Sequence, residues 1–117
     1  MANDTDNDKL RALAKINEAK IWFFTDINKS HKTMQEAKIL LEKKKVPRID
    51  CHNELGLLTA DMILTQCNES VIQMQISKAK ELLKASIAIN YPLDIIRSHF
   101  LLAVLYMMYR ANTFGLT

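Results

Sequence analysis

Between Ile72 and Ser86, apolar and small residues recur every three or four positions along the chain. Lysine and glutamate side chains occupy the opposite side, so the pattern predicts a helix with one face to bury. Pro92 has no backbone N–H and disfavours the helical conformation at Tyr91, so this helix has to end before the proline. A second, more apolar helix follows and runs to Tyr109. Together the two segments predict a helix hairpin.

The same periodicity predicts three more helices upstream, at about residues 10–27, 34–46 and 49–66. No stretch alternates strictly between apolar and polar residues, as a half-buried strand would. Only two glycines and two prolines occur in the 117 residues, which leaves little turn chemistry for a sheet. The sequence therefore predicts an all-α fold of about five helices, packed as successive antiparallel hairpins.

Two helix starts carry the spacing of a capping box, in which a hydroxyl and a side chain three residues later each pair with a backbone N–H. Thr33 with Glu36 predicts a start near residue 34, and Ser70 with Gln73 predicts the start of the fourth helix. Gly115 is the predicted stop of the last helix, because glycine adopts the left-handed cap conformation easily.

Residues 1–8 are acidic and almost without apolar side chains, and we expect them to form a disordered tail ahead of a single helical domain at residues 9–117. This start is the opposite of a signal peptide. The longest apolar run, Phe100 to Tyr109, is about half of what a bilayer requires. We therefore expect an intracellular, soluble protein with no membrane partner.

The formal net charge of +3 is mild. The basic residues are most concentrated in the run Lys43, Lys44 and Lys45, with Arg48 close by. Cations suit the negative end of a helix dipole, so we interpret this run as a solvated helix end and do not expect direct nucleic-acid binding. A small basic nucleic-acid-binding protein remains the alternative. A steep loss of affinity with added salt would distinguish it.

Candidate chemistry is sparse. Cys51 and His52 are neighbours in sequence, so on a helix their side chains point about 100° apart and cannot act as a pair. With Cys67 there are still too few ligands at workable spacing for a metal site. His31 and His99 have no obvious acid or nucleophile beside them and are interpreted as surface residues. We expect no enzymatic activity, no cofactor and no metal.

Two groups of apolar residues leave alternatives open. Three consecutive aromatic residues, Trp22, Phe23 and Phe24, cannot share one helix face, so either this helix is covered on two sides or one ring is exposed for a partner. Methionines form an adaptable binding groove in some proteins and simple core in most. Here these methionines are Met62, Met74, Met107 and Met108.

The chain also contains an imperfect repeat. Residues 34–41 align with residues 76–83, and Pro47 aligns with Pro92. This order of small-residue helix, proline and apolar helix resembles a tetratricopeptide repeat, a pair of antiparallel helices of about 34 residues with a closing proline. By this resemblance, Ala37 and Ala79 fill the small positions where the helices approach closely.

A narrower resemblance covers roughly residues 20–110 and depends on the order of several short motifs. These are Arg48-Ile49-Asp50 leading to Leu55 and Leu57, Leu82-Leu83-Lys84-Ala85, and Leu101-Leu102-Ala103-Val104-Leu105-Tyr106. They look like the first repeats of the tetratricopeptide-type subunit of the cohesin loader. The resemblance implies a nuclear, non-enzymatic scaffold that binds the extended N-terminal segment of a large HEAT-repeat subunit and supports sister chromatid cohesion.

The last predicted helix is apolar around most of its circumference, and the preceding helix can shield only one side of it. We therefore expect this helix to self-associate or to receive a partner segment. In a helical solenoid the first helices of successive repeats line the inner surface, and Tyr, Trp and Arg are the usual anchors of an interface. The residues predicted to contact the partner are Trp22, Tyr106, Tyr109 and Arg110.

Overall fold

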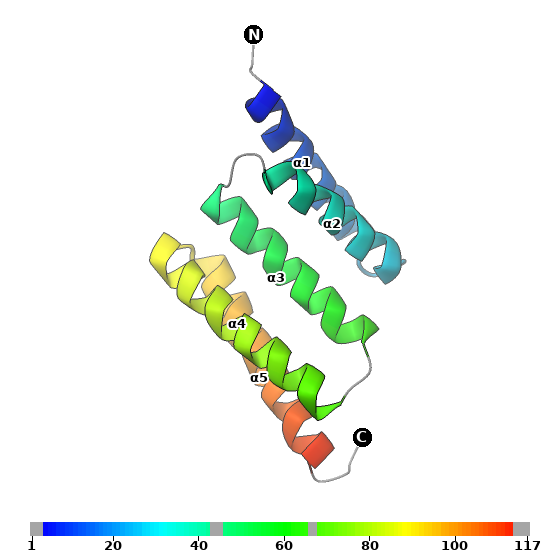
Figure 1. Ribbon diagram of the computed structural model, residues 1–117, viewed down its shortest axis with the longest axis vertical. Helices are drawn as coiled ribbons and strands as arrows, with labels where there is room; N and C mark the ends of the chain where they lie inside the picture. Colours follow the sequence, from blue (N-terminus) through cyan, green and yellow to red (C-terminus); the bar gives the residue numbers. More distant parts are fainter. Residues whose placement is uncertain (1–3, 43–45, 66–67, 114–117) are drawn as a thin grey trace.

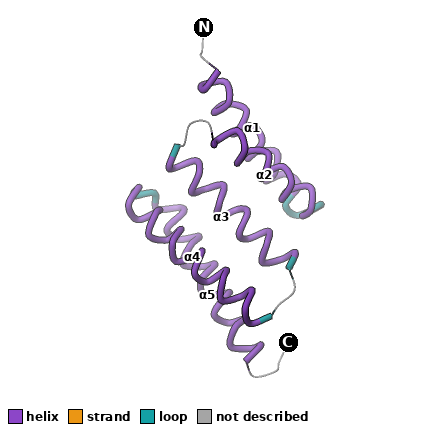
Figure 2. The backbone as a smooth tube through the Cα atoms, in the orientation of Figure 1, coloured by secondary structure: helices purple, strands orange, loops and turns teal. Residues whose placement is uncertain are grey.

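The computed structural model describes residues 4–42, 46–65 and 68–113. These residues form the helices α1 (Asp4–Trp22), α2 (Ile27–Glu42), α3 (Pro47–Leu64), α4 (Glu69–Ile89) and α5 (Pro92–Thr113), and they contain no strand (Figures 1 and 2). For the part of the chain described, the predicted all-α fold of helix hairpins is confirmed.

The helices lie in two layers. Helices α2, α3 and α4 lie side by side in the nearer layer of Figure 1, with α1 packed behind α2 and α5 packed behind α4. The shortest dimension of the molecule is 20 Å, as expected for two layers of helices about 8–10 Å apart. Because successive helices are antiparallel, α1, α3 and α5 run in the same direction.

The largest core cluster lies between α3, α4 and α5, and two smaller clusters join α1, α2 and α3. Ala37 and Ala79 are both fully buried in these clusters, so each lies where two helices approach closely, as predicted. Ion pairs also join α3 to its two neighbours, α2 and α4. Glu54 on α3 accepts from Lys38 on α2 at 3.1 Å and lies 3.7 Å from Lys78 on α4.

Several helix ends differ from prediction. Helix α2 begins at Ile27, because the Asp26 carboxylate accepts a hydrogen bond from the backbone N–H of Lys29 at 3.1 Å and caps the helix there. The predicted capping box at residues 33–36 is wrong. The Thr33 hydroxyl lies inside the helix and donates to the Lys29 carbonyl at 2.7 Å, while Glu36 pairs with Lys15 at 2.7 Å.

The start of α4 was also mispredicted. Asn68, not Ser70, caps this helix, and its side chain accepts from the backbone N–H of Val71 at 3.0 Å. The helix ends at Ile89 and is capped by Asn90, whose left-handed backbone (φ 58°) lets the N–H of Tyr91 reach the Ser86 carbonyl at 3.2 Å.

Each proline starts a helix rather than closing one. Pro47 is in the first turn of α3 and Pro92 is the first residue of α5, where a missing N–H has no cost because it would be unpaired anyway. The predicted stop at Gly115 lies outside the described residues.

The N-terminal boundary lies earlier than predicted. Helix α1 begins at Asp4, so residues 4–8 are helical rather than a tail, and residues 1–3 lie outside the described part. Asp8 is buried, with one carboxylate oxygen 3.9 Å from Arg11. Acidic residues favour the positive end of a helix dipole, so the run expected to be disordered instead extends the helix.

Replacing Ala79 with phenylalanine should destabilise the fold by roughly 1–3 kcal/mol, because the larger ring has no space at a fully buried helix contact. Ala88, which is exposed on the same helix, provides the matched control. A thermal melt should show a clear loss for Ala79→Phe and almost none for Ala88→Phe. Equal melting temperatures would mean that α4 does not pack through Ala79.

Candidate functional site

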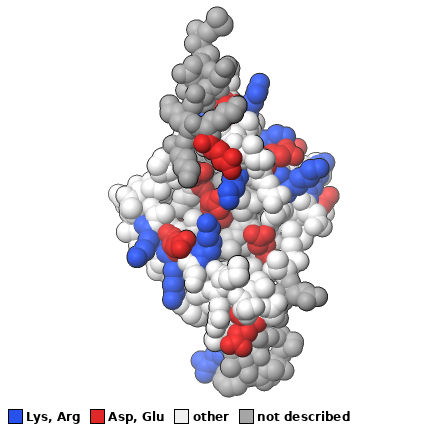
Figure 3. Space-filling model, viewed as in Figure 1, with Lys and Arg blue, Asp and Glu red and all other residues white. Residues whose placement is uncertain are grey.

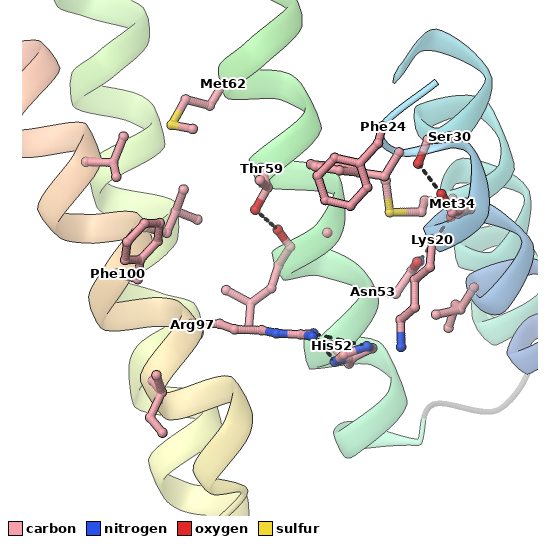
Figure 4. A pocket seen from close by; sticks show the side chains of 18 residues that line it. Lys20, Phe24, Ser30, Met34, His52, Asn53, Thr59, Met62, Arg97 and Phe100 are labelled. Atoms are coloured by element: carbon pink, nitrogen blue, oxygen red, sulfur yellow. Dashed lines mark hydrogen bonds between the residues drawn. The ribbon is translucent and has the colours of Figure 1, made fainter. Parts of the chain in front are cut away.

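A groove of about 480 Å³ follows α3 between α1 and α5 (Figure 4). Its walls come from the C-terminal part of α1 with the following turn and from the N-terminal half of α5, and α3 forms most of its floor. Residues His52, Gly56, Thr59 and Met62 recur at steps of three or four along α3, so one helix face is directed into the groove. The volume is typical of a ligand or peptide site.

The groove exists because α1 and α5 each pack against their own hairpin partner and leave the rear surface of α3 uncovered between them. Gly56 shapes the floor. A Cβ atom added there would lie 2.6 Å from the Sδ atom of Met34, so glycine allows the methionine side chain of α2 to fill the space beside α3.

One end of the groove is aromatic. Phe24 is 91% exposed and Phe100 is 72% exposed, on opposite walls, and Phe23 packs edge-on against Phe24 with ring centroids 5.2 Å apart. Leaving such rings in water forgoes about 25 cal/mol for each Å² of apolar surface. An apolar concave surface of this kind is typical of a binding site. Of the two alternatives for the aromatic run, the exposed ring is the one observed.

The other end is polar and basic. Figure 4 shows Lys20 from α1, His52 from α3 and Arg97 from α5 directed toward the same end, away from Phe24, Met62 and Phe100. The parallel direction of α1, α3 and α5 explains this polarity. Lys20 precedes Phe24, His52 precedes Met62 and Arg97 precedes Phe100, so the three basic residues lie on the same side of these aromatic and methionine residues.

A chain of contacts from the core fixes the basic end. Asp94 is only 1% exposed, and its Oδ1 atom lies 2.9 Å from Nδ1 of His52. The Nη1 atom of Arg97 lies 3.2 Å from Nδ1 and 3.4 Å from Nε2 of the same ring. The arrangement ties α5 to α3 and holds the Arg97 head at the groove.

Asn53 adds a buried polar group on the floor. Its Nδ2 atom donates to the Met34 carbonyl at 3.0 Å, while its Oδ1 atom is buried without a hydrogen-bond partner. An unpaired buried acceptor costs about 1–3 kcal/mol, so the floor of the groove is not optimised for stability.

None of the residues predicted to contact a partner lines this groove. Trp22 ends α1 and is covered by Lys29, whose Nζ atom is 3.7 Å from the ring centroid. Tyr106 is half exposed on the side of α5 near Lys80, and the Tyr109 hydroxyl donates to Glu69 at 3.3 Å. Arg110 is exposed on the last turns of α5. The role of these four residues remains a prediction.

The aromatic groove residues Phe23, Phe24 and Phe100 were not singled out as a site, although the consecutive aromatics were the available signal. Within the described residues one side of α5 is uncovered, and the expected self-association or partner binding of this helix stays a prediction. Leu102 and Leu105 are buried, whereas Ile96, Phe100 and Met107 are exposed along the opposite face.

The candidate reactive groups are structural. Cys51 is buried, its Sγ atom lies 3.7 Å from the Leu82 carbonyl oxygen, and burial followed by the nearby Asp94 charge raises the pKa of its thiol. The interpretation of His31 as a surface residue without an acid is wrong, because its Nε2 atom lies 2.7 Å from Asp61 and its side chain is 19% exposed. Within the described residues, no group of His, Cys, Asp and Glu could hold a metal ion.

Charges on the face shown in Figure 3 are mixed, with acidic and basic side chains interspersed. The guanidinium carbon of Arg48, from the basic run, lies 3.9 Å from the centroid of the Tyr91 ring. This contact makes Arg48 part of the packing of the fold. Lys43, Lys44, Lys45 and Cys67 lie outside the described residues. The nucleic-acid alternative therefore stays a prediction.

Comparison with protein families, with curated proteins and with solved structures finds no match to this chain. The resemblance to the cohesin-loader subunit thus continues to rest on its sequence motifs alone. Among the described helices, none combines the length and the apolar character that a membrane span requires.

Proposed function

We propose that this protein is an interaction module whose groove along α3 binds an amphipathic helical segment of a partner protein. The observation that carries the proposal is the pair of exposed phenylalanines, Phe24 and Phe100, on opposite walls of one concave surface. Groove-binding helices place apolar side chains at positions i, i+3, i+4 and i+7 into such surfaces. The binding role requires no catalytic group.

The shape of the groove favours a helix as the occupant. In the rear layer, α1 and α5 flank a position over α3 that no described helix fills. The floor from His52 to Met62 extends roughly 15 Å along α3, which corresponds to about three helical turns. A partner helix there would contact α1, α3 and α5 and complete a second layer of three helices.

The sequence resemblance supplies a first candidate for the partner. If the motif order reflects kinship with the cohesin-loader subunit, the occupant is a segment of its large HEAT-repeat partner and the protein acts in the nucleus. The groove itself requires only that the bound helix has apolar residues on one side.

A second copy of the chain is the alternative occupant. The exposed face of α5, with Ile96, Phe100 and Met107, is continuous with the groove wall and favours this predicted self-association. Sedimentation of the isolated chain distinguishes the two: a dimer at micromolar concentration supports the alternative, and a monomer supports binding of a different protein.

Replacing Phe100 with aspartate should weaken partner binding at least about tenfold, because buried aromatic anchors dominate helix-in-groove affinity. Fold stability should change little, since the ring is 72% exposed. The ligand is a peptide selected from a random display library on the immobilised chain, and its affinity is measured by calorimetry.

Met107→Asp is the matched control, because Met107 is also 72% exposed on α5 but does not line the groove. We expect its peptide affinity to remain close to that of the wild type. Equal losses in the two variants, or none in either, would rule out the groove as the binding site.

A further inference from the structure

The charges that line the groove are all of one sign. Lys20 and Arg97 line it together with His52, while neither aspartate nor glutamate is among the lining residues. Elsewhere on the described surface, some cations form ion pairs, as Lys15 does with Glu36 and Lys38 with Glu54. The groove therefore presents basic side chains without a carboxylate in its lining.

The two groove cations have no carboxylate partner in the described part of the chain. Lys20 is exposed and forms no ion pair there. Arg97 contacts the imidazole ring of His52, and the nearby Asp94 is buried, with its Oδ1 atom 2.9 Å from Nδ1 of that ring. A ligand carboxylate at this end would meet two cations for which the described residues provide no direct ion pair.

Arg97 is also held in place. The contacts from Asp94 through His52 to Arg97 join two helices and restrict the guanidinium before any ligand arrives. Only Nη1 is used in these contacts, so the remaining N–H donors are available. A planar guanidinium with several donors suits the two oxygens of a carboxylate, and prior ordering lowers the entropic cost of binding.

We infer that the partner helix carries aspartate or glutamate at the end that lies beside Lys20 and Arg97, and apolar anchors at the end that lies between Phe24 and Phe100. This inference rests on the proposed function and adds to it the charge and the orientation of the partner. An apolar helix without the acidic end fits the groove in either direction. The acidic end selects one of them, because reversal places a carboxylate among the aromatic rings.

The test uses a random peptide display library selected in parallel on the wild-type chain, on Lys20→Glu/Arg97→Glu and on Lys84→Glu. Lys84 is exposed on α4 and does not line the groove, so this variant controls for a charge reversal on another surface. The wild type and Lys84→Glu should enrich peptides with acidic residues on one side of an apolar stretch. The groove variant should lose this preference or enrich basic residues instead.

For the best wild-type peptide, replacing its acidic residues with Asn or Gln should weaken binding about tenfold, and this difference should shrink as salt is added. Apolar peptides without charge preference, selected equally by the wild type and the groove variant, would overturn the inference and leave the proposed function intact. If Phe24→Asp/Phe100→Asp enriches the same peptides as the wild type, the proposed function itself fails.

Discussion

Replacement of Leu105 by alanine is expected to destabilise the fold by roughly 2–5 kcal/mol, since Leu105 is fully buried at the centre of the largest core cluster. The leucine side chain of α5 packs there among residues of α3 and α4, and its removal leaves a cavity that rigid helices fill only in part. In a domain of this size, the melting temperature should fall by roughly 10 °C or more. Urea denaturation followed by circular dichroism measures the change.

Met107→Ala is the control for this substitution, because Met107 is on the same helix and faces solvent. Its free energy of unfolding should lie within about 0.5 kcal/mol of the wild type. If Leu105→Ala proved as mild as Met107→Ala, α5 would not be packed on α3 and α4 as described, and the wall of the groove would be misplaced.

His52→Ala should cost about 3 kcal/mol in the free energy of unfolding, because it leaves the Asp94 carboxylate buried without its partner. The same substitution removes the support of the Arg97 head, so any preference for acidic peptides should decline together with stability. Chemical denaturation and peptide affinity are measured on the same preparation.

A double-mutant cycle separates the pair from its surroundings. His52→Ala/Asp94→Ala removes the buried charge as well as its partner, so its loss should be smaller than the sum of the single losses by at least about 1 kcal/mol. Strictly additive losses would show that the two side chains do not interact, and the proposed positioning of Arg97 would then have no basis.

The helices could be predicted from the sequence because burial on one face leaves a period near 3.6, and the break before Pro92 has a purely local cause. Helix starts were harder. Thr33 and Glu36 have capping-box spacing by coincidence, whereas the real cap, Asp26, follows three aromatic residues and a threonine that obscured it.

The alignment of the internal repeat predicted where helices lie but not which of their residues are buried. With Pro47 aligned to Pro92, Leu57 falls on Leu102 and both are buried, yet Leu55 is buried while its counterpart Phe100 is exposed. The reason is tertiary: α3 has helices on both sides, whereas no described helix covers the side of α5 that faces the groove. No local pattern distinguishes these two environments.

The groove could not be predicted because it arises where two helices fail to meet. Residue preferences favoured Tyr106 and Tyr109 as interface anchors, but their positions on α5 direct them toward α4 and away from the groove. The consecutive aromatics allowed for one exposed ring, but the sequence alone did not indicate that Phe24 and Phe100 would lie on opposite walls of one groove.

The most direct test of the groove as the binding site is methyl NMR of the full chain, titrated with a library-selected peptide. Methyl shifts should change at Ile96, Val104 and Met62, which line the groove, and not at Ile39, Met74 and Ile87, which are exposed elsewhere. Changes confined to the second group would place binding on another surface and contradict the account.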